Sequence, residues 1–197
     1  MLHSTAQGLK YIGALGGCAA FAVCMVLVAR SEARGAKEGQ PQASAVANSS
    51  KAAPLFGITI QSGYRDWRLI SVAHEEGSLN DIRAILGNDV AIKTYREGKL
   101  PFPDGMIIAR IAWKDVPSEE NNKVFGRAQS FVAGSAPDWY LQFMVKDSKK
   151  YAATRGWGYA QFDKDGNPSA DEVKLKACAP CHEPAKASDF VFTHYAP

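Results

Sequence analysis

Two of the four cysteines and one of the four histidines lie together in one short segment near the C-terminus, Cys178-Ala179-Pro180-Cys181-His182. Two thiols in this spacing, followed directly by an imidazole, form the Cys-x-x-Cys-His pattern to which a c-type haem is attached. On a helix the two thiols lie about one turn apart, so that each can add to one haem vinyl group. His182 then supplies an axial nitrogen to the iron. The pattern therefore predicts one covalently bound haem c, held by Cys178, Cys181 and His182.

Three other interpretations of this segment explain less of it. A redox disulfide between the two cysteines gives no reason for the histidine that follows them. A zinc site needs a second pair of ligands, and the sequence contains no second Cys-x-x-Cys pair and no matching pair of histidines. A chance match is the third interpretation, and the export signal described below argues against it, because haem c is attached outside the cytoplasm.

The position of the motif in the chain limits the second axial ligand. Only residues 183–197 follow His182, and none of them is a methionine, so a small electron carrier with an N-terminal motif and a later Met ligand is excluded. A distal ligand would come from earlier residues, and the candidates are Met106, Met144, His74 and a lysine. Methionines are more often core residues than ligands. We therefore expect an open distal side that binds NO, CO or peroxide.

The N-terminal segment predicts export. Residues 11–29 contain no charged side chain, with Lys10 before them and Arg30 after them. An uncharged run of this length is long for a signal peptide and just long enough to span a bilayer. We therefore assign residues 1–36 to a cleaved signal peptide or to an uncleaved membrane-anchor helix, and both interpretations remain open. Either one predicts a bacterial periplasmic protein, soluble after cleavage or anchored to the inner membrane.

The remainder of the chain has the composition of one globular domain. Residues 37–54 are rich in Ala, Ser, Gln, Gly and Pro without an apolar period, which predicts a flexible linker, and residues 55–197 should form the folded domain. Hydrophobic residues make up 46% of the chain and charged residues 22%, which excludes wholesale disorder. The net charge is +3, of which three cations and one glutamate in residues 1–36 account for +2. The nearly neutral domain has no basic field for nucleic acid.

Apolar alternation and turn signals indicate an α+β domain, mainly an antiparallel β-sheet with a few helices. Strands are predicted at 67–73, 82–86, 106–113, 129–133, 139–145 and 158–163. Helices are predicted at 88–97, with Val90, Ile92 and Tyr95 facing inward, and at 169–177, where Ser169 is the cap. A C-terminal helix should carry the haem-attachment motif.

Two finer predictions concern the strand at 139–145 and the residues after it. Alternation along this strand places Tyr140, Gln142 and Met144 on one face. The lysine-rich residues 146–150 are predicted to form a solvated loop, on which an acidic redox partner protein could dock.

Short segments distributed over residues 64–197 match, in their order along the chain, those of a known family. They are Tyr64-Arg65-Asp66-Trp67, Asp81-Ile82-Arg83, Phe102-Pro103-Asp104-Gly105, Val145-Lys146-Asp147-Ser148, the Cys-Ala-Pro-Cys-His motif, and Asp189-Phe190-Val191-Phe192-Thr193 with Tyr195 and Pro197. In this order they resemble the cytochrome P460 family, which includes the cytochromes c′-beta. The resemblance implies a mostly antiparallel sheet that holds a five-coordinate haem c, often in a homodimer. Some members oxidise hydroxylamine or NO, whereas the c′-beta members bind gases.

The resemblance also implies three residues on the distal side of the haem. The arginine of the family matches Arg83. Its haem cross-linking lysine, counted five residues from Gly105, corresponds to Arg110, and its distal carboxylate corresponds to Gln142. An arginine stays protonated and is a poor nucleophile, and a glutamine cannot act as a general base. Hydroxylamine oxidation is therefore disfavoured; Lys114, four residues beyond Arg110, is too far along the strand to replace it.

The chemistry of such a pocket leaves alternatives open. If Arg83, Arg110 and Gln142 all face the iron, two guanidinium groups would favour anionic ligands such as nitrite or peroxide anion. Alternatively, the arginines bind haem propionates or a neighbouring carboxylate. Three functions remain: binding of NO or another small ligand at open iron, oxidation or reduction of hydroxylamine, NO or peroxide, and six-coordinate electron transfer. Arg110, Gln142 and the lack of a convincing distal ligand favour the first, and the enzyme class stays undecided.

Overall fold

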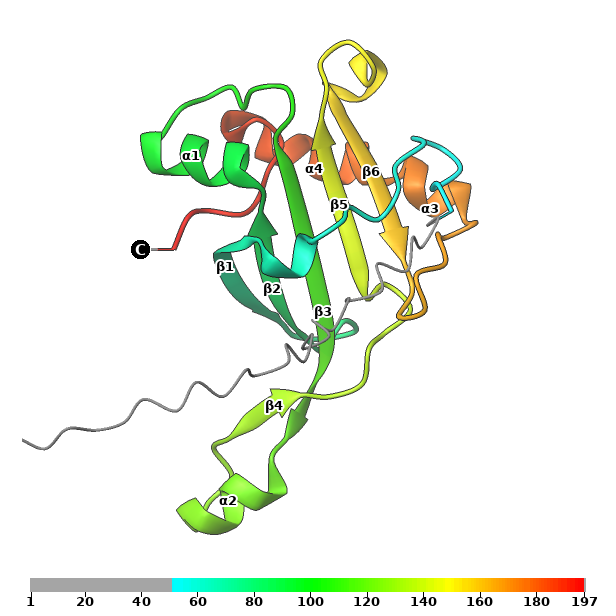
Figure 1. Cartoon of the computed structure of the whole chain (residues 1–197). Coiled ribbons are helices and arrows are strands. Elements are labelled where there is room, and N and C mark those ends of the chain that lie inside the picture. Colours follow the sequence, from blue (N-terminus) through cyan, green and yellow to red (C-terminus); the bar gives the residue numbers. More distant parts are fainter. Residues whose placement is uncertain (1–50, 197) are drawn as a thin grey trace, which may run out of the picture. The chain divides into compact units, whose positions relative to one another are not determined.

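Five antiparallel strands form the sheet on which the molecule is built (Figure 1). The computed structural model describes residues 51–196, so the apolar segment 11–29 lies outside the described residues. The sheet contains, in spatial order, β1 (Arg68–Glu75), β2 (Asp81–Gly87), β3 (Ile107–Pro117), β5 (Leu141–Lys146) and β6 (Trp157–Phe162). Within residues 51–196, no helix is long and apolar enough to cross a membrane. The predicted α+β class with a mainly antiparallel sheet is confirmed.

Short helices connect and flank the strands. They are α1 (Asp89–Glu97), α2 (Glu119–Phe125), α3 (Glu172–Lys176), α4 (Cys178–His182) and the 3-10 helices η1 (Tyr64–Asp66), η2 (Ala152–Thr154) and η3 (Glu183–Ser188). In Figure 1, α3 and α4 lie behind the sheet, whereas the segment that contains η1 crosses in front of it. The predicted haem-attachment motif, Cys178–His182, forms helix α4, as the sequence predicted.

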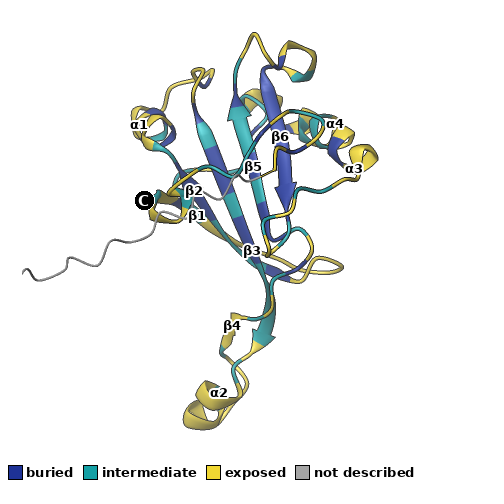
Figure 2. Cartoon of the chain, turned by 45° about the vertical axis from the view of Figure 1, so that its right-hand side comes forward, coloured by how far each residue is buried: buried dark blue, intermediate teal, exposed yellow. Residues whose placement is uncertain are grey.

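The two faces of the sheet have different coverings because side chains alternate along each strand. One face carries Leu86, Ile111 and Phe143, and residues 53–67 pack against it. Ala53, which falls in the predicted linker 37–54, is buried in this cluster. The other face is covered by α1 and by the C-terminal residues, and Figure 2 shows the buried strands between these layers.

The start of helix α1 is set by a local capping signal, and its orientation is set by packing against the sheet. Asn88 caps the helix by accepting a hydrogen bond from the Ala91 amide at 3.0 Å; the sequence left Asn88 and Asp89 as the two candidate caps. Ala91 and Ile92 are buried, but Val90, predicted to face inward, is exposed. The reason is a close contact between Gly87 and Ala91, which turns the helix so that Ala91 faces the sheet: a methyl group on Gly87 would lie 2.8 Å from the Ala91 Cβ.

Three sequence-based predictions are wrong near the ends of β5 and β6. Tyr140 does not share the face of Gln142, because β5 begins only at Leu141 and Tyr140 turns into the other cluster. Lys146 is not part of a solvated loop, because it ends β5 and is buried. The helix predicted at 169–177 begins only at Glu172, since the Ser169 amide donates to the Gln161 carbonyl and prolongs the β6 turn.

An arm extends from the sheet beyond the end of β2. The last residues of β3 pair with β4 (Phe131–Ala133), and α2 closes the arm at its tip (Figure 1). The large apolar side chains on this arm are exposed; they are Val124, Phe125, Phe131 and Val132. Exposed apolar side chains that cluster in this way are typical of an interaction surface.

The close contact at Gly87 predicts that adding a methyl group there lowers the stability of the protein. At an uncrowded position with ordinary backbone angles, Gly→Ala stabilises a protein by roughly 0.4–1 kcal/mol through the unfolded state. At Gly87 the new methyl group would also lie 2.7 Å from Ile70 Cδ1, so we expect Gly87→Ala to lower the free energy of unfolding by about 1–3 kcal/mol. Urea unfolding measures the difference, and an increase in stability would contradict the packing of α1.

Candidate functional site

A cavity of about 640 Å³ lies between one face of the sheet and the C-terminal residues. The residues that line it include Ile85, Arg110 and Gln142 from the sheet and Leu175, Cys178 and His182 from the helices. Its volume falls within the range of roughly 300–1,000 Å³ typical of cofactor and ligand sites. The cavity therefore brings the attachment motif and the predicted distal residues to one place.

His182 is held in one orientation on the helical side of the cavity. Its Nδ1 lies 2.7 Å from the carbonyl oxygen of Phe190, and its ring packs between the rings of Tyr159 and Phe192 at 5.3 and 5.1 Å. A carbonyl can only accept, so Nδ1 carries the proton and Nε2 keeps its lone pair. Burial lowers the pKa of His182, which favours the neutral form. This is the arrangement that a metal-ligating histidine requires.

The two cysteines of the motif are both free thiols in helix α4. Cys178 lines the cavity and burial raises the pKa of its thiol, while Cys181 is exposed. The thiol of Cys178 lies 3.7 Å from the carbonyl oxygen of Lys174, one turn earlier. The Cys178 thiol and the His182 imidazole line the cavity, and the Cys181 thiol lies in the same short helix. Two thiols and an imidazole are the donor set that a covalently attached haem needs, so the residues present fit this group.

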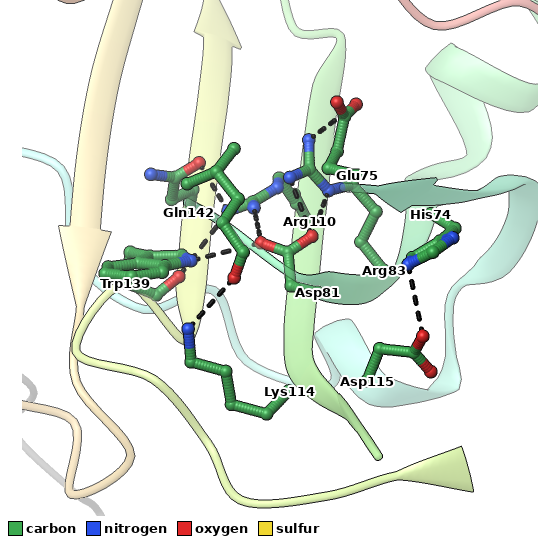
Figure 3. Close-up of polar contacts among 10 residues, drawn as sticks. His74, Glu75, Asp81, Arg83, Arg110, Lys114, Asp115, Trp139 and Gln142 are labelled. Carbon is green, nitrogen blue, oxygen red and sulfur yellow. Dashed lines mark hydrogen bonds and ion pairs between the residues drawn. The ribbon is translucent and has the colours of Figure 1, made fainter. Parts of the chain in front are cut away.

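A row of polar side chains crosses the sheet on the cavity side. Arg110 pairs in register with Gln142, and Gln142 pairs with Gln161 on β6. Arg110 Nη1 donates to Gln142 Oε1 at 2.9 Å (Figure 3). Gln142 Nε2 in turn donates to Gln161 Oε1 at 3.1 Å. Because a guanidinium can only donate, it determines the orientation of the Gln142 amide, and this amide in turn determines that of Gln161.

Asp81 is the residue of this site that sequence reasoning missed. Its carboxylate is fully buried and accepts from Arg83 Nε at 2.8 Å, from Arg110 Nη2 at 2.9 Å and from Trp139 Nε1 at 3.1 Å. The side chains converge from three separate segments, as Figure 3 shows. One signal was available, because Asp81 and Arg83 are two residues apart and therefore share a face of a strand.

The charges of this cluster balance. Arg83 also pairs with Glu75 at 3.2 Å, so two carboxylates face two guanidinium groups. Both arginines thus bind a neighbouring carboxylate, which is one of the alternatives that the sequence left open. Burial, together with the charge of Arg83, lowers the pKa of Arg110 to about 10, so Arg110 remains charged at neutral pH.

Some donors of the cluster are still unpaired within residues 51–196. Arg110 Nε and Arg83 Nη2 are buried and make no hydrogen bond in this part of the chain. Arg83 Nη2 does lie 2.7 Å from Asp81 Oδ1, which is an ion pair without hydrogen-bond geometry. An orphaned buried donor is costly, so these groups suit a carboxylate or an electronegative ligand in the cavity.

The structure places only some of the candidates for a second axial ligand beside the cavity. Met106 is buried in the core beside Trp157, and His74 pairs with Asp115 at 3.1 Å on the other face of β1. Lys114 donates to the Leu79 carbonyl. The cavity is lined instead by Met144, Lys174 and His194. Met144 and a lysine were among the candidates from the sequence, whereas His194 was set aside there as too close to the attachment motif.

Comparison with known proteins agrees with this geometry. The family model of cytochrome P460 matches residues 61–193, which include every residue of the cavity named above except His194. The sheet, the cavity and the motif define a haem-binding domain of the c type, and the chain belongs to the cytochrome P460 family. A comparison with curated proteins found no match.

Asp81→Asn tests whether the cluster depends on this carboxylate. The substitution keeps the shape of the side chain but leaves two buried guanidinium groups facing a neutral amide. We expect the free energy of unfolding to fall by about 3–5 kcal/mol, the usual loss when one partner of a buried ion pair is removed. The matched control is Asp165→Asn, which removes an exposed partner of Lys164 and should change stability by less than about 0.5 kcal/mol. Equal effects in urea unfolding would show that Asp81 is not the centre of the cluster.

Proposed function

We propose that this chain is an exported c-type cytochrome with one haem attached through Cys178 and Cys181, and with His182 as its proximal ligand. The distal side is open and binds a small ligand such as NO. The observation that carries the proposal is the orientation of His182, whose Nε2 is free beside the same cavity that Cys178 and the polar row line. Family membership, which implies a haem protein of the c type, supports it.

Each group of the chain then has a definite task. The thiols of Cys178 and Cys181 hold the haem, and the Phe190 carbonyl keeps the imidazole of His182 in the tautomer that can ligate iron. When bound, the haem supplies an iron that binds small molecules and changes its oxidation state. Arg110 and Gln161 present N–H groups to the cavity, which favours a ligand that carries or gains negative charge.

The same residues argue against hydroxylamine oxidation. Arg110 stands where the resemblance implies a cross-linking lysine, and its guanidinium is bound to Asp81 and Gln142. Gln142 stands where the resemblance implies a carboxylate, and an amide cannot accept a proton from a substrate. An oxidoreductase acting on NO or peroxide remains the alternative. Six-coordinate electron transfer is the second alternative, because Met144, Lys174 and His194 also line the cavity.

The proposal includes export, since haem c is attached outside the cytoplasm. It is supported by the uncharged run of residues 11–29, either as a cleaved signal peptide or as a membrane anchor. A homodimer and a redox partner protein stay predictions; the exposed apolar side chains on the β4–α2 arm are a surface where a second copy could bind.

Covalent attachment can be tested with the four cysteines of the chain. We expect Cys178→Ser with Cys181→Ser to abolish the haem that remains bound to the protein in a denaturing gel, because no thiol of the motif is left to form a thioether. Cys18→Ser with Cys24→Ser is the matched control, since these cysteines belong to the N-terminal segment, and it should retain the haem. Haem retained after loss of both motif cysteines would contradict the proposal.

The distal side can be tested by absorption spectroscopy of the purified holoprotein. We expect a five-coordinate spectrum that changes when NO is added to the reduced protein, and no turnover of hydroxylamine. Met144→Leu, which keeps the side-chain volume, should leave the spectrum unchanged, because an open site has no methionine ligand. A six-coordinate spectrum indifferent to NO would support electron transfer, and a strongly red-shifted Soret band in the reduced protein would reveal a haem cross-link and support the enzyme.

A further inference from the structure

The chain makes an unusual turn directly before its last residues. Asp189 and Phe190 both have positive φ angles, 51° and 66°. Two consecutive residues other than glycine in the left-handed region are rare, and a bulky phenylalanine there is strained. Such a turn persists only where the surrounding structure holds it, so the contacts that hold it indicate what it is for.

A buried ion pair holds this turn against the sheet. Lys146 Nζ lies 2.8 and 3.0 Å from the two carboxylate oxygens of Asp189, and both side chains are about nine-tenths buried. The Phe102 amide donates to the same carboxylate at 2.9 Å, and Trp157 Nε1 donates to the Asp189 carbonyl at 2.8 Å. Lys146 also lies over the Trp157 ring at 4.9 Å. The last residue of β5 and the first of β6 therefore determine where the turn lies.

The turn determines the position of the Phe190 carbonyl group. The Phe190 amide donates to the Ala185 carbonyl at 2.9 Å, and the Phe190 carbonyl oxygen lies 2.7 Å from Nδ1 of His182. A chain of contacts thus runs from Lys146 through Asp189 and Phe190 to the imidazole. Two of the segments that carry the family resemblance, Val145–Ser148 and Asp189–Thr193, meet in this chain.

We propose that Lys146 and Asp189 are positioning residues for His182, and that through the Phe190 carbonyl they set how strongly His182 donates to the iron. The proposal rests on the proposed function, because it takes His182 to be the proximal ligand. A strong hydrogen bond from Nδ1 increases the electron density at Nε2, which strengthens the bond to iron and favours the oxidised state. A looser turn would weaken both effects.

The variants are chosen so that the turn loses its ion pair but keeps its shape. Asp189→Asn removes the charge, and asparagine tolerates a positive φ better than most residues do. Lys146→Met removes the other charge with little change in length. The double variant leaves no unpaired buried charge, so it keeps the experiment possible should either single variant fail to fold. Gly87→Ala is the control for general destabilisation, because Gly87 contacts Ile70 and Ala91 and not the turn.

The readouts are the iron–histidine stretching frequency of the reduced holoprotein in resonance Raman spectra and the midpoint potential. We expect the stretching frequency to fall and the potential to rise in Asp189→Asn, Lys146→Met and the double variant, and neither to change in Gly87→Ala. Folded variants with the frequency and potential of the wild type would overturn the proposal and leave the pair a structural contact. Absence of an iron–histidine band in the wild type would instead overturn the proposed function.

Discussion

The carboxylate of Asp81, which has no contact with solvent, is the interaction on which the polar wall of the cavity depends. Burying one charge is unfavourable unless it is paired and hydrogen-bonded, and Asp81 is paired with two guanidinium groups and with the indole of Trp139. The second cation is compensated in turn by Glu75. Removing any member would leave an uncompensated charge, so the cluster is stable only as a whole. This is how a sheet face can carry two arginines beside a largely apolar cavity.

A second buried carboxylate, that of Asp189, has a comparable positioning role next to His182. Asp189 uses Lys146 as its cation, and the pair fixes a carbonyl rather than a side chain. In both clusters the cations come from strands of the sheet. Arg83 lies on β2 and Arg110 on β3 in the first cluster, and Lys146 ends β5 in the second. The sheet is therefore the rigid element that positions both walls of the cavity. Arg110, Gln142 and Gln161 pair in register on β3, β5 and β6, so the antiparallel sheet places these three side chains in one row without help from the loops.

The features that the sequence predicted are those with local causes. Apolar alternation located the strands, a cap signal at Asn88 or Asp89 located α1, and the spacing of Cys178, Cys181 and His182 predicted the haem motif. The parts that were missed depend on partners far along the chain. Asp81 on β2 pairs with Arg110 on the neighbouring strand β3, and Lys146 pairs with Asp189 only after the C-terminal residues fold back. A lysine followed by Asp-Ser-Lys-Lys has the composition of a loop, and only its distant carboxylate makes burial favourable.

The direction of the hydrogen bonds in the polar row limits the chemistry of the cavity. Arg110 can only donate, so Gln142 and then Gln161 are turned with their oxygens toward Arg110 and their N–H groups away from it. Within residues 51–196, Gln161 Nε2 makes no hydrogen bond to another group, and neither does Arg110 Nε. A ligand in the cavity would therefore meet donors from this row. Donors stabilise negative charge on a bound molecule, but they do not take protons from it, and oxidation of hydroxylamine releases protons. The orientation of two amides, set by one guanidinium, thus supports the proposed binding of a small ligand rather than its oxidation.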